Sequence, residues 1–356
     1  MREPIRNDPN APCDPRRREA LSHRRTRRAL LGAPAALALA CARPAGAQPG
    51  GAATAGATPA GVELAYVGNE NGGSISVIDV AGAAVLATIE TGGKPRSIAS
   101  ARGGARLFVS DRQAGALQVF DPVARTRVGS IRLGESPEAV HASADGRLLA
   151  VALEEDNRVA FVDAARAALA FDVPTRGPNP EHAVFSPDGR WVYVGAENAE
   201  QVDVIDVAQR RVVASVPVGA RPRGIGFLPD GSRAYVACEL ADAVHVIDAR
   251  EHRPMGSVRS GPRVNGIAVA PDGRTVFASN GGGSVTLIDT RGDSAAGRIE
   301  VGQRPWNMAV SRDGARLLVA NGRSNSVSVV DVAQRRVVAT VPVGALPWGV
   351  HIPAPA

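Results

Sequence analysis

Seven side chains with ionic, polar or aromatic character recur at intervals of 41 to 43 residues in this sequence. Each follows a proline, or in one case a valine, that opens a short apolar run. They are Arg96, Glu138, Glu181, Arg223, Asn265, Trp306 and Trp348. Carboxylates, guanidinium groups and indole rings around one site can hold a polar ligand or anchor a protein partner. His182 and Asn307, next in the chain to two of these residues, complete the candidate set.

The elements that must position these side chains form a repeat of about 42 residues, from Leu64 to Ile352. Each unit has an aspartate at the end of a Val/Ile-rich run: Asp79, Asp121, Asp163, Asp206, Asp248, Asp289 and Asp331. Periods of about 40–45 residues with several short strands are typical of propeller blades. The sequence therefore predicts an all-β, seven-bladed β-propeller with four antiparallel strands per blade. Because the aspartate recurs in every blade, we expect it to cap the following turn.

The turns and the two ends of the repeat indicate how the ring is built. Asp-Gly turns are expected between the first and second strands of five blades, at 145–146, 188–189, 230–231, 272–273 and 313–314. Arg102-Gly103-Gly104 stands in their place in an earlier unit. The first repeat lacks an inner strand, whereas the last carries an additional one at 347–352. We expect the C-terminal strand to join the N-terminal blade and close the ring.

In a propeller, the loops that lead to the inner strands share one face with the loops that join second to third strands. The nearly constant proline is a scaffold feature, whereas the residue after it varies. Two interpretations of that residue stay open: the set binds a ligand or partner, or its arginines and glutamates pair and plug the channel. The second set of loops carries acids that could attract a cationic partner, although a solvated rim is the simpler expectation: Glu70, Glu154, Glu155, Asp156, Glu197, Glu200, Glu239 and Asp242.

Catalytic signals are sparse. His182 is the only histidine that we expect on this face and the only one considered for acid–base chemistry. His141, His245 and His351 fall in predicted strands, and His252 falls on the opposite face. The sequence has no G-x-S-x-G motif, no Walker loop and no histidine cluster suited to copper. We therefore assign no catalytic residue, no metal site and no cofactor.

Residues 1–47 have the organisation of an export signal. An arginine-dense stretch at 16–28 precedes an apolar run at 29–42 and the small-residue site Ala45-Gly46-Ala47. The pair Arg27-Arg28 favours the twin-arginine (Tat) route over Sec, and Cys41 leaves a lipoprotein alternative. The apolar run is too short for a membrane span. We expect a flexible Ala/Gly-rich linker at 48–61, the propeller at 62–352 and a tail at 353–356.

Charge and cysteine content narrow the function classes. Residues 1–47 hold ten of the 41 basic residues and four of the 35 acidic residues. Residues 48–356 therefore have 31 basic residues (41 − 10) and 31 acidic residues (35 − 4). The formal net charge of +6 thus belongs to the leader, and no nucleic-acid footprint remains. Cys238 is the single cysteine after the leader, which excludes an intramolecular disulfide in the mature chain. We expect a monomer.

The segments Tyr66-Val67-Gly68-Asn69 and Val319-Ala320-Asn321-Gly322 resemble the strand motif of YVTN-type β-propeller proteins. This resemblance covers residues 62–352. Segments at 135–138, 303–306, 321–331 and 346–350 are similar, more narrowly, to propeller proteins associated with PQQ-dependent alcohol catabolism. That resemblance implies an exported accessory protein that acts alongside quinoprotein dehydrogenases and c-type cytochromes. It does not imply the dehydrogenase itself, because those enzymes are longer, tryptophan-rich propellers with a vicinal cysteine pair.

Three functional hypotheses follow. The leading one is a periplasmic, non-catalytic binding propeller whose partner is a quinoprotein dehydrogenase or c-type cytochrome system, or a small polar ligand. One rival is a lactonase-like hydrolase or isomerase that uses Glu138, Glu181, His182 and an arginine around a substrate or divalent metal in the channel. The other rival is a structural cell-surface repeat protein.

Overall fold

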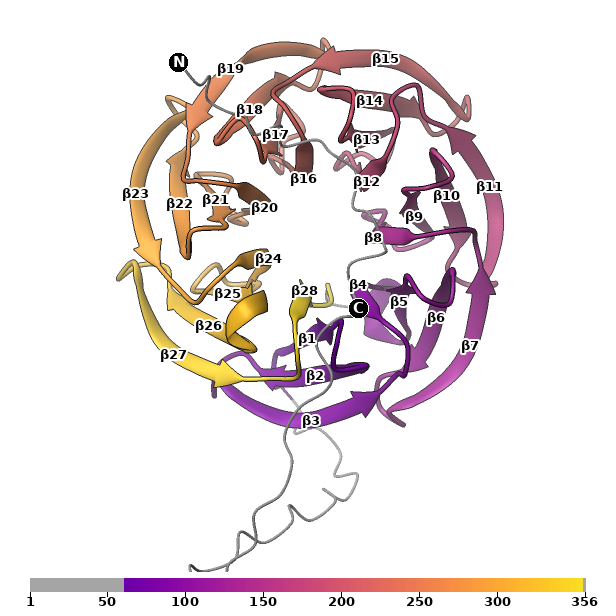
Figure 1. Cartoon of the computed structure of the whole chain (residues 1–356), viewed down its shortest axis with the longest axis vertical. Coiled ribbons are helices and arrows are strands. Elements are labelled where there is room, and N and C mark those ends of the chain that lie inside the picture. Colours follow the sequence, from indigo (N-terminus) through magenta and orange to yellow (C-terminus); the bar gives the residue numbers. More distant parts are fainter. Residues whose placement is uncertain (1–60, 355–356) are drawn as a thin grey trace, which may run out of the picture. The chain divides into compact units, whose positions relative to one another are not determined.

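The computed structural model describes residues 61–354, apart from the side chain of Arg102, and these residues form seven four-stranded antiparallel sheets. Figure 1 shows the sheets arranged as blades around a central axis. The predicted all-β, seven-bladed propeller is therefore confirmed. The expected export signal and almost all of the linker lie outside the described residues.

Blade 1 contains both ends of the propeller: β28 (Pro347–His351), β1 (Leu64–Asn69), β2 (Ser74–Asp79) and β3 (Ala84–Glu90). Blade 2 contains β4 (Pro95–Ser100), β5 (Leu107–Asp111), β6 (Ala116–Asp121) and β7 (Thr126–Arg132). Blade 3 contains β8 (Pro137–Ala142), β9 (Leu148–Leu153), β10 (Arg158–Asp163) and β11 (Ala168–Pro174). Blade 4 contains β12 (Pro180–Phe185), β13 (Trp191–Ala196), β14 (Gln201–Asp206) and β15 (Arg211–Pro217).

The remaining blades have the same strand order from the axis outward. Blade 5 contains β16 (Pro222–Phe227), β17 (Arg233–Cys238), β18 (Ala243–Asp248) and β19 (Arg253–Arg259). Blade 6 contains β20 (Val264–Val269), β21 (Thr275–Asn280), β22 (Ser284–Asp289) and β23 (Ser294–Glu300). Blade 7 contains β24 (Pro305–Val310), β25 (Arg316–Asn321), β26 (Ser326–Asp331) and β27 (Arg336–Pro342). Two short 3-10 turns, η2 (Arg102–Gly104) and η3 (Gly322–Ser324), lie between strands.

The ring closes through blade 1, as predicted. β28 pairs antiparallel with β1, with Val350 opposite Val67 and His351 opposite Tyr66. Figure 1 shows this contact where the yellow end of the ribbon meets the indigo one. The last strand thus supplies the inner strand that the first repeat lacks, and blade 1 has four strands like the other six.

The repeated aspartates and glycines have the architectural roles expected of them. In all seven blades the aspartate that ends the third strand accepts a hydrogen bond from a backbone N–H two or three residues later. The glycines of the five Asp-Gly turns, Gly146, Gly189, Gly231, Gly273 and Gly314, have φ between 67° and 74°. That left-handed conformation favours glycine, so these turns stop one strand and start the next.

The hydrophobic core consists of layers between neighbouring blades. In β5, Leu107 and Val109 pack in the layer shared with blade 1, whereas Phe108, between them, packs in the layer shared with blade 3. Successive side chains of a strand point to opposite faces, so a strand covered on both faces is apolar without alternation. Each fully buried Leu, Val or Phe contributes about 1.5–3 kcal/mol. These layers hold the seven inner strands around the axis.

Antiparallel connectivity places the loops on two faces. The loops that enter the inner strands and those that join second to third strands lie on one face, which we call the inner-loop face. The Asp-Gly turns and the Asp-capped turns lie on the opposite face. The variable side chains named above therefore belong to the inner-loop face.

Candidate functional site

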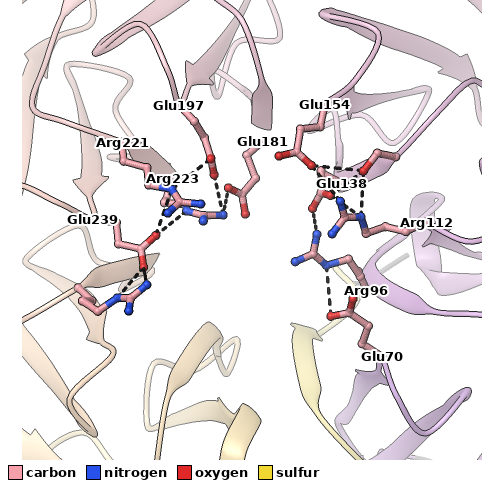
Figure 2. A network of polar contacts seen from close by, with 12 residues as sticks. Glu70, Arg96, Arg112, Glu138, Glu154, Glu181, Glu197, Arg221, Arg223 and Glu239 are labelled. Atoms are coloured by element: carbon pink, nitrogen blue, oxygen red, sulfur yellow. Dashed lines mark hydrogen bonds and ion pairs between the residues drawn. The ribbon is translucent and has the colours of Figure 1, made fainter. Parts of the chain in front are cut away.

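Every inner strand is irregular directly after its first residue. In β4, Pro95 pairs with Asp111 and Ile98 pairs with Val109, so two residues of β4 oppose one residue of β5. Register shifts occur at the same place in the other six blades. A bulge bends its strand and redirects the side chains there. This local feature turns the variable residue of each blade toward the channel mouth, as Figure 2 shows for Arg96, Glu138, Glu181 and Arg223.

The first ion-pair group comprises Glu70, Arg96, Arg112, Glu138 and Glu154. Arg96 pairs with Glu138 on the next blade, and its Nε lies 3.5 Å from Oε2 of Glu70. Arg112 Nε is 2.9 Å from Glu138 Oε1, and Arg112 Nη2 is 3.1 Å from Glu154 Oε2. The Glu138 side chain is only 1% exposed. A carboxylate buried this deeply requires such pairing.

The second ion-pair group comprises Glu181, Glu197, Arg221, Arg223, Glu239, Arg263 and Arg304. Arg223 pairs with Glu181, and its Nη1 lies 2.7 Å from Glu197 Oε1. The fully buried Glu239 has four guanidinium groups around it: Arg223, Arg263 and Arg304, each at 2.9 Å, and Arg221 at 3.6 Å. Figure 2 shows the two groups facing each other across the channel.

Five of these residues come from a position that the sequence pattern also repeats, the residue directly after a second strand: Glu70, Arg112, Glu154, Glu197 and Glu239. The expectation of a solvated acidic rim is wrong for three of them, because Glu70, Glu197 and Glu239 are 8%, 6% and 0% exposed. They turn inward to pair with arginines. The structure shows the pairing of arginines with glutamates, one of the two interpretations, whereas ligand or partner binding stays a prediction.

Glycine occupies the same position in blades 6 and 7, for a steric reason. A Cβ on Gly281 would lie 2.5 Å from Arg304 Nη1, and a Cβ on Gly322 would lie 3.2 Å from Trp306 Cε3. In blades 6 and 7, glycine in place of a glutamate thus leaves room for the guanidinium group of Arg304 and the indole group of Trp306.

The two ion-pair groups differ in their numbers of acidic and basic residues and in the pKa values of their glutamates. The first has three glutamates and two arginines; the second has three glutamates and four arginines. Burial raises the pKa of Glu138 and that of Glu197 to about 7. Burial acts in the same direction on Glu239, but Arg223, Arg304 and Arg263 outweigh it and hold its pKa at about 2. Burial also lowers the pKa of Arg223.

Three histidines line the channel beyond the ion pairs. His141 Nε2 and His182 Nδ1 are 3.3 Å apart, and His351 Nε2 is 2.9 Å from Ser100 Oγ. Burial lowers the pKa of His141 and of His351 to about 4, and it lowers the pKa of His182 well below its usual value. The three imidazoles are therefore neutral at physiological pH. Sequence reasoning singled out His182 alone and missed the other two.

The signal for His141 and His351 was their shared position, four residues after the first proline of their inner strands. Residues at this position in different blades point to the same axis, so two histidines there approach each other in space. The ring of Trp348 stacks on His182 at 5.8 Å between centroids and carries the Arg96 guanidinium 4.6 Å from its centroid. Trp348 is 2% exposed and packs inside the channel.

A cavity of about 310 Å³ occupies the channel, with lining residues from all seven inner strands. Its polar groups include His141, His182, His351, Ser97 and Asn307. Within the described residues, His182 Nε2 and Asn307 Nδ2 are buried and have no hydrogen-bond partner.

Seven of the nine candidate residues separate into two layers. Arg96, Glu138, Glu181 and Arg223 belong to the ion-pair groups, whereas His182, Asn307 and Trp348 line the cavity. Asn265 is buried at the bulge of β20, and Trp306 is partly exposed, with its ring 6.5 Å from that of Trp348. Among residues 61–354, no three His, Cys, Asp or Glu side chains are grouped as a metal ion would require.

Comparisons with known proteins agree on the propeller architecture. The family model "Lactonase, 7-bladed beta-propeller" matches residues 208–340, and "Cytochrome D1 heme domain" matches residues 148–265. A solved structure titled Kuenenia stuttgartiensis Hydrazine Synthase superposes with a TM-score of 0.69 at 22% identity, over 75% of this chain and 92% of that one. A functionally unknown protein from Desulfotomaculum acetoxidans superposes with a TM-score of 0.74 at 16% identity, over 83% and 100%.

These likenesses establish the fold, and the chain is similar to members of more than one propeller family. No curated protein matches it in sequence. Over residues 61–354 we find no helix with the length and apolar character needed to cross a bilayer.

Proposed function

We propose that this chain is an exported, non-catalytic binding propeller that docks an acidic protein partner on its inner-loop face. The pairing of Glu138 with Arg96 and of Glu181 with Arg223 carries this proposal. A hydrolytic or isomerising mechanism would need these carboxylates to be free to exchange protons with a substrate or to ligate a metal. Both are buried and engaged by guanidinium groups that would first have to be displaced.

The rim exposes cationic and aromatic groups beside the acids Glu155, Glu200 and Asp242. The side chains of Arg112 and Arg221 are 36% exposed and that of Arg263 is 56% exposed, and Trp306 on blade 7 is partly exposed. Guanidinium groups recognise carboxylates with two parallel hydrogen bonds, and Arg and Trp are enriched among the residues that dominate binding energy. The second ion-pair group also has one more arginine than glutamates. A partner that presents carboxylates fits the arginines of this group.

The sequence features of residues 1–47 and the resemblance to propellers associated with PQQ-dependent alcohol catabolism support a periplasmic setting. A c-type cytochrome or quinoprotein dehydrogenase in that compartment is the partner class that we propose. Docking on a rim of fixed charges would fit a role as an accessory to alcohol oxidation.

The lactonase-like alternative has one observation in its favour, the family-model match to residues 208–340. That match does not include Glu138, Glu181 or His182, the residues that such an enzyme would use here. The match to the cytochrome D1 model overlaps it, so the two matches do not favour one activity.

A capture experiment tests the proposal. The exported protein is immobilised and exposed to periplasmic extract from alcohol-grown cells, and captured proteins are identified by mass spectrometry. The rim variant Arg221→Gln/Arg263→Gln is compared with Arg250→Gln/Arg291→Gln, which removes two exposed arginines from turns of the same two blades on the opposite face. We expect an acidic redox protein to be retained by the wild type and the opposite-face variant but not by the rim variant. Equal retention by all three would refute the proposal.

A further inference from the structure

The strongest unassigned feature is the central cavity, whose lining does not include the rim arginines Arg112, Arg221 and Arg263. Its volume of about 310 Å³ lies at the lower end of the range of small-molecule sites, about 300–1,000 Å³. A dry cavity of about 150 Å³ is already large enough for benzene. The space is therefore sufficient for one small organic molecule.

The walls are apolar around a polar patch. Ile98, Val140, Ile225, Ile267 and Met308 contribute aliphatic surface. The polar patch has His182 and Asn307, each of which has one buried nitrogen that no described residue bonds. His182 is 3% exposed. Because a buried polar atom without a partner is costly, these two nitrogens mark a part of the cavity where polar atoms of a ligand can bind.

The hydrogen bond between His141 and His182 can run in either direction, according to the tautomers of the two rings, and that direction decides which ligand atom suits His182 Nε2. When His141 Nε2–H donates to His182 Nδ1, the neutral His182 carries its proton on Nε2 and donates into the cavity. Asn307 Nδ2 is also a donor. A carbonyl oxygen has two lone pairs and can accept from both groups.

The ligand should carry no net charge. The three imidazoles in the channel are neutral, because burial lowers the pKa values of His141 and His351 to about 4 and that of His182 well below its usual value. The guanidinium of Arg96 lies on the Trp348 ring and is already paired with Glu138. Among the described lining residues, none therefore carries a charge that could compensate the burial of an ion, which is costly without a partner.

We propose that the central cavity is a binding site for a small uncharged carbonyl compound, whose oxygen accepts hydrogen bonds from His182 and Asn307 while its apolar part packs against the aliphatic wall. The cavity is distinct from the rim, so binding of this compound does not depend on whether a protein partner docks there.

Saturation-transfer NMR titration of the purified protein tests this site with four probes of similar shape. Acetophenone presents the carbonyl, 1-phenylethanol a hydroxyl, ethylbenzene no polar group and benzoate a negative charge. We expect acetophenone to bind at one site with a Kd of about 1 mM or tighter, and ethylbenzene and benzoate to bind about tenfold more weakly or not at all. A weaker affinity for 1-phenylethanol than for acetophenone would confirm that the patch acts as a pair of donors.

Two variants remove the donors without filling the cavity. Asn307→Leu keeps the side-chain size, and His182→Phe keeps a ring for Trp348 to stack on; each should weaken acetophenone binding about tenfold. The rim variant Arg221→Gln/Arg263→Gln is the control and should bind acetophenone as the wild type does, even where it has lost its protein partner. The proposal is overturned if acetophenone does not bind, if ethylbenzene or benzoate binds as tightly, or if both cavity variants keep wild-type affinity while remaining folded.

Discussion

Arg96 and Glu138 form an ion pair between neighbouring blades although 42 residues separate them in the chain. Arg223 and Glu181 are separated by the same 42 residues, as are Arg112 and Glu154. One period of the repeat returns the chain to the same height on the next blade, so side chains one period apart become neighbours at the channel mouth. Opposite charges at this spacing therefore pair, and the variation between blades produces a charge pattern around the ring.

Two glutamates of the ring should respond differently to the same substitution. Glu239→Gln removes a carboxylate whose pKa is held at about 2 by arginines, so it should lower the free energy of unfolding at pH 7.5 by about 3 kcal/mol. Glu138→Gln is the matched control, because burial already disfavours the charged form of Glu138. Without this carboxylate, Arg96 still has Glu70 as a partner and Arg112 still has Glu154. We expect a change within about 1 kcal/mol for this variant. Urea unfolding measures both, and equal losses would contradict the contrast in pKa.

The stability of the Glu138→Gln variant relative to the wild type should depend on pH. The pKa of Glu138 is raised from 4.5 to about 7 in the folded protein, so its favourable contribution is complete below pH 4.5 and is lost as the pH rises through 7. The glutamine side chain of the variant does not titrate. The variant should therefore gain up to about 3 kcal/mol over the wild type between pH 4.5 and pH 8. A difference that stays constant over this range would show that the carboxyl titrates normally.

His351 should give the opposite pH dependence. Its pKa is lowered from 6.5 to about 4 by burial, so the wild type has the full contribution above pH 6.5 and loses it as the pH falls through 4. His351→Gln retains a group that can bond Ser100 and cannot be protonated in the unfolded chain. We expect the stability of the variant relative to the wild type to increase as the pH falls from 7 to 4, as measured by thermal or urea unfolding. If the two proteins keep the same stability difference at both pH values, burial of the imidazole does not lower its pKa.

The proposed export route makes a prediction about residues 1–47. Arg27→Lys/Arg28→Lys should trap the precursor in the cytoplasm, because Tat recognition requires the paired arginines. Arg24→Lys/Arg25→Lys alters the adjacent pair equally and should be exported normally. Cell fractionation measures the export of both variants, and mass spectrometry identifies the mature N-terminus, which we expect at Gln48. Export of the first variant at the wild-type level would exclude the Tat route.

The fold was predictable because the repeat of about 42 residues can be recognised directly in the sequence. Asp79 and its six counterparts mark each third strand, and the missing inner strand before Leu64 together with the additional strand at 347–352 predicts the closure that β28 and β1 make. Such features depend on local turn chemistry, which a single chain reveals without knowledge of distant contacts.

The site was only partly predictable because it depends on distances across the channel. The variable residues Arg96, Glu138, Glu181 and Arg223 were identified from their position in the repeat, but whether they pair or stay free depends on side-chain reach. Glu239 was assigned to a solvated rim because its four arginine neighbours come from loops of three different blades. The contact between His141 and His182 likewise joins two inner strands.

The affinity of the purified propeller for its captured partner tests the central claim most directly. Biolayer interferometry would compare the wild type, Arg221→Gln/Arg263→Gln and Arg250→Gln/Arg291→Gln at about 50 and about 200 mM salt. We predict that the rim variant binds at least about tenfold more weakly and with a smaller salt dependence, because two exposed cation–carboxylate contacts are lost. The opposite-face variant should bind as the wild type does. Equal affinities for the wild type and the rim variant at both salt concentrations would contradict docking on the inner-loop face.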